Sequence, residues 1–319
     1  MEVVVAVLAP RHARPVTVLD STQATELFRA PAQRHIDVGA GAVAYRRCGA
    51  GPDVLFVHGW PVSGSTFRTL LPFLTPHVTC HVIDLVGAGQ SRFDRTTRID
   101  LDQHVASIRR VIDVLGLQDY SVVGHDSGGM MARHAVAGDP QLRSMALVNT
   151  EQPQGLTARF RQFLLMGKLP GFEHILAWAG MRPGLRRNRF LLGDCFTDRS
   201  LLGGTFEEFV LAPLRDDPER RWAAGQLMRT WDSRLIDELA AVHAKIDVPV
   251  QLVWGEDDPF FPVAWAREMV ETFPNAQLHV VAGTKLFSHE EKPEEVAAAM
   301  LPVLMGEAAV GGRIATKSV

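Results

Sequence analysis

Residues 120–130 read Tyr-Ser-Val-Val-Gly-His-Asp-Ser-Gly-Gly-Met, and this stretch decides the fold. An apolar run stops at the pentad Gly124 to Gly128, and an amphipathic segment follows. This order predicts a buried strand, a sharp turn and a helix, because small residues at such a turn let the helix pack close to the strand. Asp126 is the central residue of the turn. A carboxylate beside the positive end of a helix can attack an electrophilic carbon, although the pentad alone is equally well explained as tight packing.

Apolar strands alternate with helical segments on both sides of this turn. The further strands are expected at residues 54–57, 79–84, 142–148, 250–254 and 277–281, and helices at 65–74, 101–115, 263–273 and 293–304. Two alternating runs, 34–38 and 42–47, predict an antiparallel hairpin at a sheet edge. The fold class is therefore α/β, with a mostly parallel central sheet covered by helices on both faces. Reactive groups should gather at the carboxyl ends of the strands.

Residues 151–244 differ in character from the rest of the chain. Aromatic residues are spread there among Gly, Pro and Arg without a clear strand. We predict a helical cap inserted between a first part of the core, residues 1–150, and a second part with the C-terminal tail, residues 245–319. Most of these aromatic side chains should form the core of the cap, while Trp178, Trp222 and Trp231 are candidates for a substrate pocket beneath it.

The composition of the chain limits the kinds of molecule that it is expected to bind. The 319 residues carry a formal net charge of -3, which does not suggest nucleic acid or an anionic membrane as a partner. The three cysteines are isolated and fit reduced thiols in a cytoplasmic protein. We read no export signal in Met1 to Pro10 and expect the tail after Gly306 to be frayed. No motif requires a metal or a cofactor, so the expected partner is a small-molecule substrate, and the sequence leaves the oligomeric state open.

Five short segments carry a family resemblance. They are His58-Gly-Trp-Pro61, Asp84-x-x-Gly-x-Gly-x-Ser91, Gly124-His-Asp-Ser-Gly128, Trp254-Gly-Glu-Asp-Asp258 and Glu290-Glu-Lys-Pro293. With these segments in order, the chain resembles the α/β-hydrolase fold from about residue 34 to residue 305. Within that fold it is similar to the branch with an Asp nucleophile, the epoxide hydrolases and haloalkane dehalogenases. The resemblance makes packing alone a poor explanation of the pentad.

The resemblance also implies roles for single residues. Asp126 matches the nucleophile, and the backbone N–H groups of Ser127 and Trp60 match the oxyanion hole. His58 matches a histidine that ties its own loop together. Asp258 matches the acid that orients the catalytic histidine, ahead of its neighbours Asp257 and Glu256. Some dehalogenases carry that acid after the preceding strand, where this chain has Asn149.

The catalytic histidine is where the pattern breaks. In the family it follows the last strand, a few residues before a Glu-x-Pro. Aligned on residues 291–293, its position holds Leu286, and His289 is the only histidine nearby. The pattern favours His289 as a surface residue in the first turn of the final helix. The alternative is a rebuilt loop in which His289 faces Asp126 and Asp258.

The leading interpretation is a hydrolase that forms a covalent ester between Asp126 and a small to medium apolar or aromatic substrate. The tryptophan of His58-Gly-Trp-Pro61, Trp60, favours an epoxide over a haloalkane as the substrate. The 2 tyrosines of the chain lie outside the predicted cap, although epoxide hydrolases of this type use cap tyrosines as proton donors. Three alternatives stay open: a haloalkane dehalogenase-like hydrolase, a ligand-binding or non-hydrolytic protein with a triad degenerate at Leu286, and an ester or lactone hydrolase.

Overall fold

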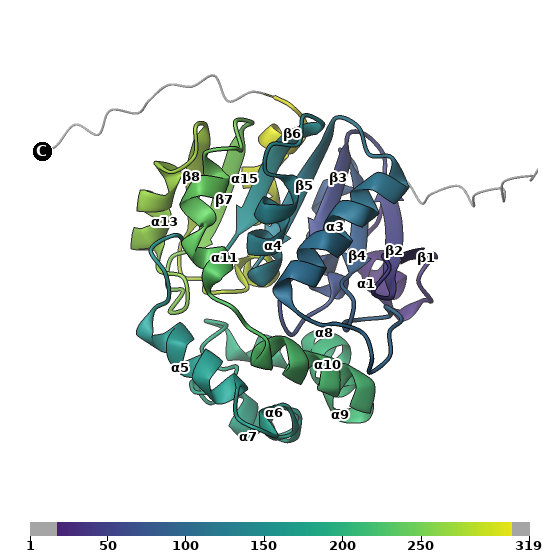
Figure 1. The fold of residues 1–319 in the computed structure, drawn as a ribbon, viewed down its shortest axis with the longest axis vertical. Helices are drawn as coiled ribbons and strands as arrows, with labels where there is room; N and C mark the ends of the chain where they lie inside the picture. Colours follow the sequence, from purple (N-terminus) through teal and green to yellow (C-terminus); the bar gives the residue numbers. More distant parts are fainter. Residues whose placement is uncertain (1–17, 308–319) are drawn as a thin grey trace, which may run out of the picture.

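An eight-stranded sheet forms the centre of the computed structural model, which describes residues 18–307 (Figure 1). The strands lie in the order β1-β2-β4-β3-β5-β6-β7-β8, and only the pairs β1–β2 and β2–β4 are antiparallel. Their bounds are β1 Arg34–Asp37, β2 Ala42–Gly49, β3 Asp53–Val57, β4 Thr79–Asp84, β5 Tyr120–His125, β6 Leu142–Val148, β7 Val250–Gly255 and β8 Ala276–Val281. The predicted fold class and the edge hairpin are confirmed. The expectations for Met1 to Pro10 and for the tail beyond residue 307 lie outside the described residues.

Helices cover both faces of the sheet, and an apolar core lies on each. One face carries α1 (Ser21–Arg29), α2 (Leu71–Leu74) and α15 (Pro293–Leu304). The other face carries α3 (Leu101–Leu115), α4 (Ser127–Val136) and α13 (Val263–Val270). Strands β3, β5 and β6 are buried almost throughout because both of their faces are covered, which explains why they read as continuous apolar runs.

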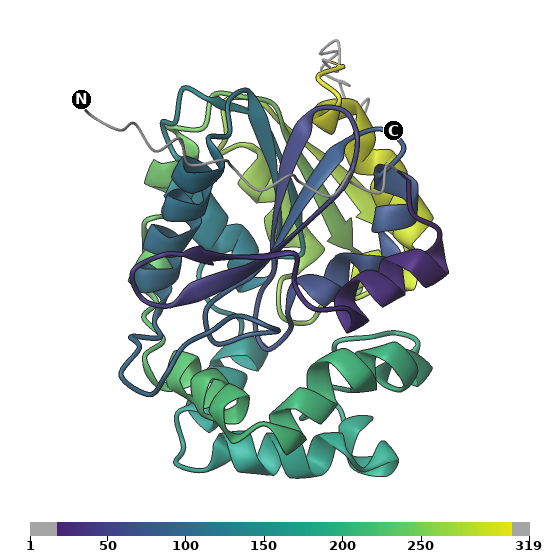
Figure 2. The ribbon, with the colours of Figure 1, turned by 90° about the vertical axis from the view of Figure 1, so that its right-hand side faces the viewer.

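The segment between β6 and β7 is helical, as expected. Figures 1 and 2 show its first part gathered beyond one end of the sheet. Its elements are α5 Ala158–Gly167, α6 Phe172–Gly180, α7 Pro183–Arg186, η2 Arg199–Leu202, α8 Gly204–Phe206, η3 Glu207–Leu211, α9 Ala212–Asp216, α10 Pro218–Arg229, α11 Arg234–Asp237 and α12 Leu239–His243. The last two, α11 and α12, pack against α4 of the central layer instead. The division into core and cap at residues 150 and 244 stays a prediction.

Two local features differ from the expected pattern. The helix expected at residues 65–74 is a 3-10 helix, η1 (Gly64–Thr69), followed by the short α2, and Ser63 caps η1 through its side chain. Helix α1 was not expected, yet Asp20 and Gln23 form a capping box at its start. No helix among residues 18–307 has the length and apolar character needed to cross a membrane.

Candidate active site

The turn between β5 and α4 places Asp126 at the carboxyl end of the central strand. Asp126 has a φ of 52°, a conformation that costs energy in residues other than glycine and often marks a functional site. Glycines make room around it: a side chain at Gly128 would overlap the backbone of His58, and one at Gly59 would overlap the Asp126 carboxylate. The small residues of two sequence motifs therefore bring the His58 loop against the turn.

The Asp126 carboxylate is buried and holds one strong hydrogen bond. The backbone N–H of Trp60 donates to its Oδ2 at 2.9 Å, and the Ser127 hydroxyl lies 3.4 Å from the same oxygen. Desolvation raises the pKa of Asp126 to about 7, although hydrogen bonds from the backbone of Ser127 and Trp60 oppose the shift. The two predicted oxyanion donors are thus the groups that contact the predicted nucleophile.

A mostly apolar cavity, which we call the Asp126 cavity, opens over this carboxylate. The space over it amounts to about 590 Å³ when the open solvent at its mouth is included, with about 50 Å³ of room for the centres of water molecules. Besides Asp126 it is lined by Trp60, Pro61, Ser127, Phe160, Phe163, Leu164, Leu192, Cys195, Phe206, Met228, Trp231, Phe260, Phe261, Leu286 and Phe287. Neither histidine nor tyrosine is among these described lining residues. The cavity therefore suits an apolar or aromatic molecule and offers it one carboxylate.

Asp258 lies buried behind this cavity in a fully occupied set of hydrogen bonds. Its Oδ1 accepts from the backbone N–H groups of Phe260 and Phe261 at 2.8 and 3.1 Å, and its Oδ2 accepts from Asn149 Nδ2 at 2.7 Å. Burial raises the pKa of Asp258 to about 7 in spite of these bonds. Asn149 in turn accepts from the Ser288 hydroxyl and the Gly255 N–H, so it holds the acid loop and the last loop together.

His289 is placed differently from both interpretations of the sequence. It is completely buried, so the surface interpretation is wrong. Its Nε2 lies 2.8 Å from the hydroxyl of Thr66 in η1, and its ring packs against His125 with centroids 4.3 Å apart. His289 is not among the residues that line the Asp126 cavity, whereas Leu286 is. A catalytic part for His289 would therefore require the loop to rearrange.

The short helix α14 (Ser288–Glu291) explains this position. Its Glu290 forms a buried ion pair with Arg68 at 2.7 Å and accepts a hydrogen bond from Thr66 at 2.9 Å. Because these bonds fix α14 on η1, His289 is carried to the same side. Burial lowers the pKa of His289 well below its ordinary value, and the neighbouring His125 and Arg68 act in the same direction.

Of the three tryptophans predicted for the pocket, Trp231 alone lines the Asp126 cavity. Its Nε1 is buried and has no hydrogen-bond partner. The prediction is corrected for the other two. Trp178 is 53% exposed, with the guanidinium of Arg182 stacked on its ring, and Trp222 stacks on Phe93 outside the cavity.

His58 ties its loop together, as expected. Its Nδ1 lies 2.8 Å from the carbonyl oxygen of Gly59, and its Nε2 accepts from the backbone N–H of Leu85 at 2.8 Å. Both ring nitrogens are therefore occupied, and burial lowers the pKa of His58. The neutral ring thereby holds the loop that positions the Trp60 N–H.

A buried network behind the turn was missed by the sequence reasoning. The hydroxyl of Thr150 donates to the carbonyl oxygen of Asp126 at 2.8 Å, and Arg133 Nη2 donates to the same hydroxyl at 2.9 Å. Glu151 lies beside them, and desolvation followed by the charge of Asp126 raises its pKa. The available signal was a Thr-Glu pair directly after a buried strand. Within residues 18–307, no cluster of three or more His, Cys, Asp or Glu side chains could hold a metal ion.

Known proteins resemble this chain over most of its length. A family model described as alpha/beta hydrolase fold matches residues 52–293. The pimeloyl-[acyl-carrier protein] methyl ester esterase of Xanthomonas campestris is 36% identical over 251 residues, covering 78% of this chain and 90% of that protein. Haloalkane dehalogenase 2 of Mycobacterium tuberculosis is 27% identical over 286 residues, covering 84% and 93%. The structure of the epoxide hydrolase CorEH superposes with a TM-score of 0.69 at 22% identity, over 85% of this chain and 97% of that one.

Proposed function

We propose that this chain, which belongs to the α/β hydrolase fold family, uses Asp126 to capture an apolar epoxide as a covalent ester. The observation that carries the proposal is the Asp126 carboxylate, held by the Trp60 N–H at the wall of an apolar cavity. A carboxylate needs no base to become nucleophilic once it is ionised.

The first step follows from the hydrogen bonds of the carboxylate. Oδ2 stays on the Trp60 N–H while the other carboxylate oxygen attacks the epoxide carbon. The carbon–oxygen bond of the ring breaks, and the ring oxygen takes a proton from solvent to give a hydroxyalkyl ester. Oδ2 becomes the carbonyl oxygen of this ester, already in contact with a donor that can stabilise negative charge when water later adds.

The second step, hydrolysis of the ester, lacks the histidine that would activate water. Hydrolysis of the ester needs a base to activate water, and Leu286 lines the cavity where the family places histidine. Asp258 has its carboxylate oxygens occupied by two backbone N–H groups and Asn149. We therefore expect the ester to form much faster than it is hydrolysed, so that turnover is slow and the adduct accumulates.

Trp231 favours dehalogenation as a second candidate. Its buried indole N–H has no partner in the cavity, and such a group can hold a leaving halide. In that case the carbon–halogen bond breaks as the ester forms, and halide is released without any proton uptake. An epoxide would instead add its whole mass to the protein.

Intact-protein mass spectrometry with a panel of apolar epoxides and haloalkanes tests both candidates. We expect an epoxide to add its full mass to one peptide that contains Asp126, whereas a haloalkane would add its alkyl group and release halide. Asp126→Asn is the matched control and should give no adduct. The proposal fails if no epoxide yields either adduct or diol, or if the Asn variant behaves like the unmodified protein.

A further inference from the structure

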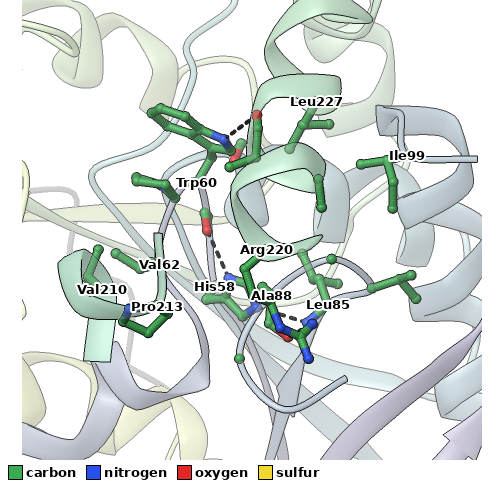
Figure 3. Close-up of a pocket in the computed structure, with 18 of the residues that line it drawn as sticks. His58, Trp60, Val62, Leu85, Ala88, Ile99, Val210, Pro213, Arg220 and Leu227 are labelled. Atoms are coloured by element: carbon green, nitrogen blue, oxygen red, sulfur yellow. Dashed lines mark hydrogen bonds between the residues drawn. The ribbon is translucent and has the colours of Figure 1, made fainter. Parts of the chain in front are cut away.

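A second cavity lies on the other side of Trp60, and we call it the Arg220 cavity (Figure 3). It lies between the His58 loop, the loop after β4, and helices α9 and α10. Its space amounts to about 580 Å³ when the open solvent at its mouth is included, with about 50 Å³ of room for the centres of water molecules. Its walls are mainly apolar side chains, among them Val62, Leu85, Ile99, Val210, Leu214 and Leu227. In Figure 3, Arg220 reaches from α10 towards Ala88. The cavity could therefore hold an apolar chain that ends near a positive charge.

Arg220 carries the positive charge of this cavity, and several contacts hold its guanidinium in place. It donates to the carbonyl oxygens of Ala88 and Ser91 at 3.2 and 2.6 Å and lies over the Phe93 ring, 4.8 Å from the ring centroid. Asp217, the half-exposed N-cap of α10, lies 3.6 Å from its Nε, and the buried Asp84 adds a second negative charge nearby. No Asp or Glu is among the described residues that line this cavity. Burial lowers the pKa of Arg220, which means that its surroundings do not fully replace water around the cation.

His104 adds an unsatisfied polar group to the lining of the same cavity. It is 2% exposed, and its Nδ1 has no hydrogen-bond partner. Burial lowers the pKa of His104 to about 4, so the ring is neutral near pH 7 and can donate one N–H. The other histidine of the wall, His58, has both nitrogens occupied. A buried guanidinium and a free imidazole donor together match a ligand rich in acceptor oxygens.

The two cavities share a wall. Trp60, Pro61 and Ser127 line both of them, so the Arg220 cavity begins next to the backbone donors that hold the Asp126 carboxylate. Between them stands the Trp60 indole, whose Nε1 donates to the carbonyl oxygen of Ala224 in α10 at 2.9 Å. A single elongated molecule that passes this ring would occupy both cavities.

We propose that the Arg220 cavity binds the carboxylate end of an elongated apolar substrate whose electrophilic carbon lies beside Asp126. This inference rests on the proposed function for the second half of its statement. Arg220 and His104 donate to the carboxylate, and the apolar walls bury the chain between the two ends. Arg220 is then a specificity-determining residue for substrates that carry a terminal acid.

The test compares ω-epoxy carboxylic acids with ω-epoxy alcohols of the same chain length. The measured quantity is the ratio of the second-order rates of adduct formation, acid over alcohol, at each length. We expect the ratio to fall about tenfold or more in Arg220→Gln and to recover in part in Arg220→Lys. Arg221→Gln is the matched control, because Arg221 lies next on α10 and also bonds two backbone carbonyls, but does not line the cavity. It should leave the ratio unchanged.

Binding of unreactive ligands separates this inference from the proposed function. Saturated carboxylic acids and the alcohols of equal length are titrated into the unmodified protein and the three variants by calorimetry. The same tenfold change in the ratio of dissociation constants supports the Arg220 cavity even if no epoxide reacts. Equal affinity for acid and alcohol in the unmodified protein overturns it, as does a ratio that Arg220→Gln leaves unchanged.

Discussion

Leu286 stands at the position where the family pattern places a catalytic histidine. Its side chain lines the Asp126 cavity, and its backbone carbonyl accepts a hydrogen bond from His125 Nε2 at 3.0 Å. Under the proposed function, an apolar side chain at this place cannot activate water for hydrolysis of the ester. We therefore expect Leu286 to favour the formation of the ester over its removal.

A histidine at position 286 should restore the missing step. We expect Leu286→His to shorten the lifetime of the Asp126 adduct by about a hundredfold, the size of a general-base contribution. Pulse labelling with an epoxide followed by mass spectrometry over time measures that lifetime. Leu286→Met keeps the volume without a base and should leave the adduct long-lived. Equal lifetimes in the two variants would show that the missing imidazole is not what limits hydrolysis.

Asp126 also links the site to stability. Its pKa rises from 3.8 to about 7 in the folded protein, mainly because of burial. Between these two values the folded state keeps a proton that the unfolded chain releases, so the free energy of unfolding falls as the pH rises through this window. Asp126→Asn removes the titration. At pH 8 it should raise the free energy of unfolding by about 2–4 kcal/mol relative to the unmodified protein, and by much less at pH 4.

Urea denaturation at the two pH values measures this difference. Asp119→Asn is the control, since it makes the same exchange of carboxylate for amide at a side chain that is 79% exposed. A gain from Asp126→Asn that is the same at both pH values would mean that the carboxylate does not carry the cost of burial assigned to it.

At the scale of elements, α14 and η1 act as one unit. Arg68 and Glu290 form an ion pair with side-chain exposures of 6% and 3%, so removing either partner leaves a buried charge. We expect Glu290→Ala to lower the free energy of unfolding by about 3–5 kcal/mol. Thermal and urea denaturation measure the loss. Glu295→Ala, which removes an exposed partner of His279, should change it by less than about 1 kcal/mol, and similar losses in the two variants would contradict the assignment.

The same unit shows which parts of the site the sequence could not predict. Asp126 and Trp60 lie in local motifs whose spacing determines their conformation, and the structure brings them into contact as expected. His289 has no such local signal. Its burial depends on a partner in η1, Thr66, that is 223 residues away in the chain, and no periodic pattern reports such a pairing.

For the whole molecule, the sequence predicted no order of the strands in the sheet, but the fold class followed from the alternation of apolar runs and helical segments. The residues that line the cavities could not be predicted in this way. The sequence identified the aromatic segment but could not separate Trp231, which lines the Asp126 cavity, from Trp178, which faces solvent, because both occur in short helices or loops without a strong periodicity. Arg220 and His104 gave no signal either, because they lie in different helices, α10 and α3, and line one cavity only in the folded chain.

Trp60 contacts two parts of the molecule, the Asp126 turn and the helices α5 and α10. Its backbone N–H binds the Asp126 carboxylate, while its indole N–H binds α10, and its ring also packs against Phe163 of α5. A displacement of α5 and α10 large enough to admit or release a bulky molecule would pull on the loop that positions the donor. Under the proposed function, we therefore expect a molecule to enter while these helices are displaced and to react only after their contacts with Trp60 have formed again.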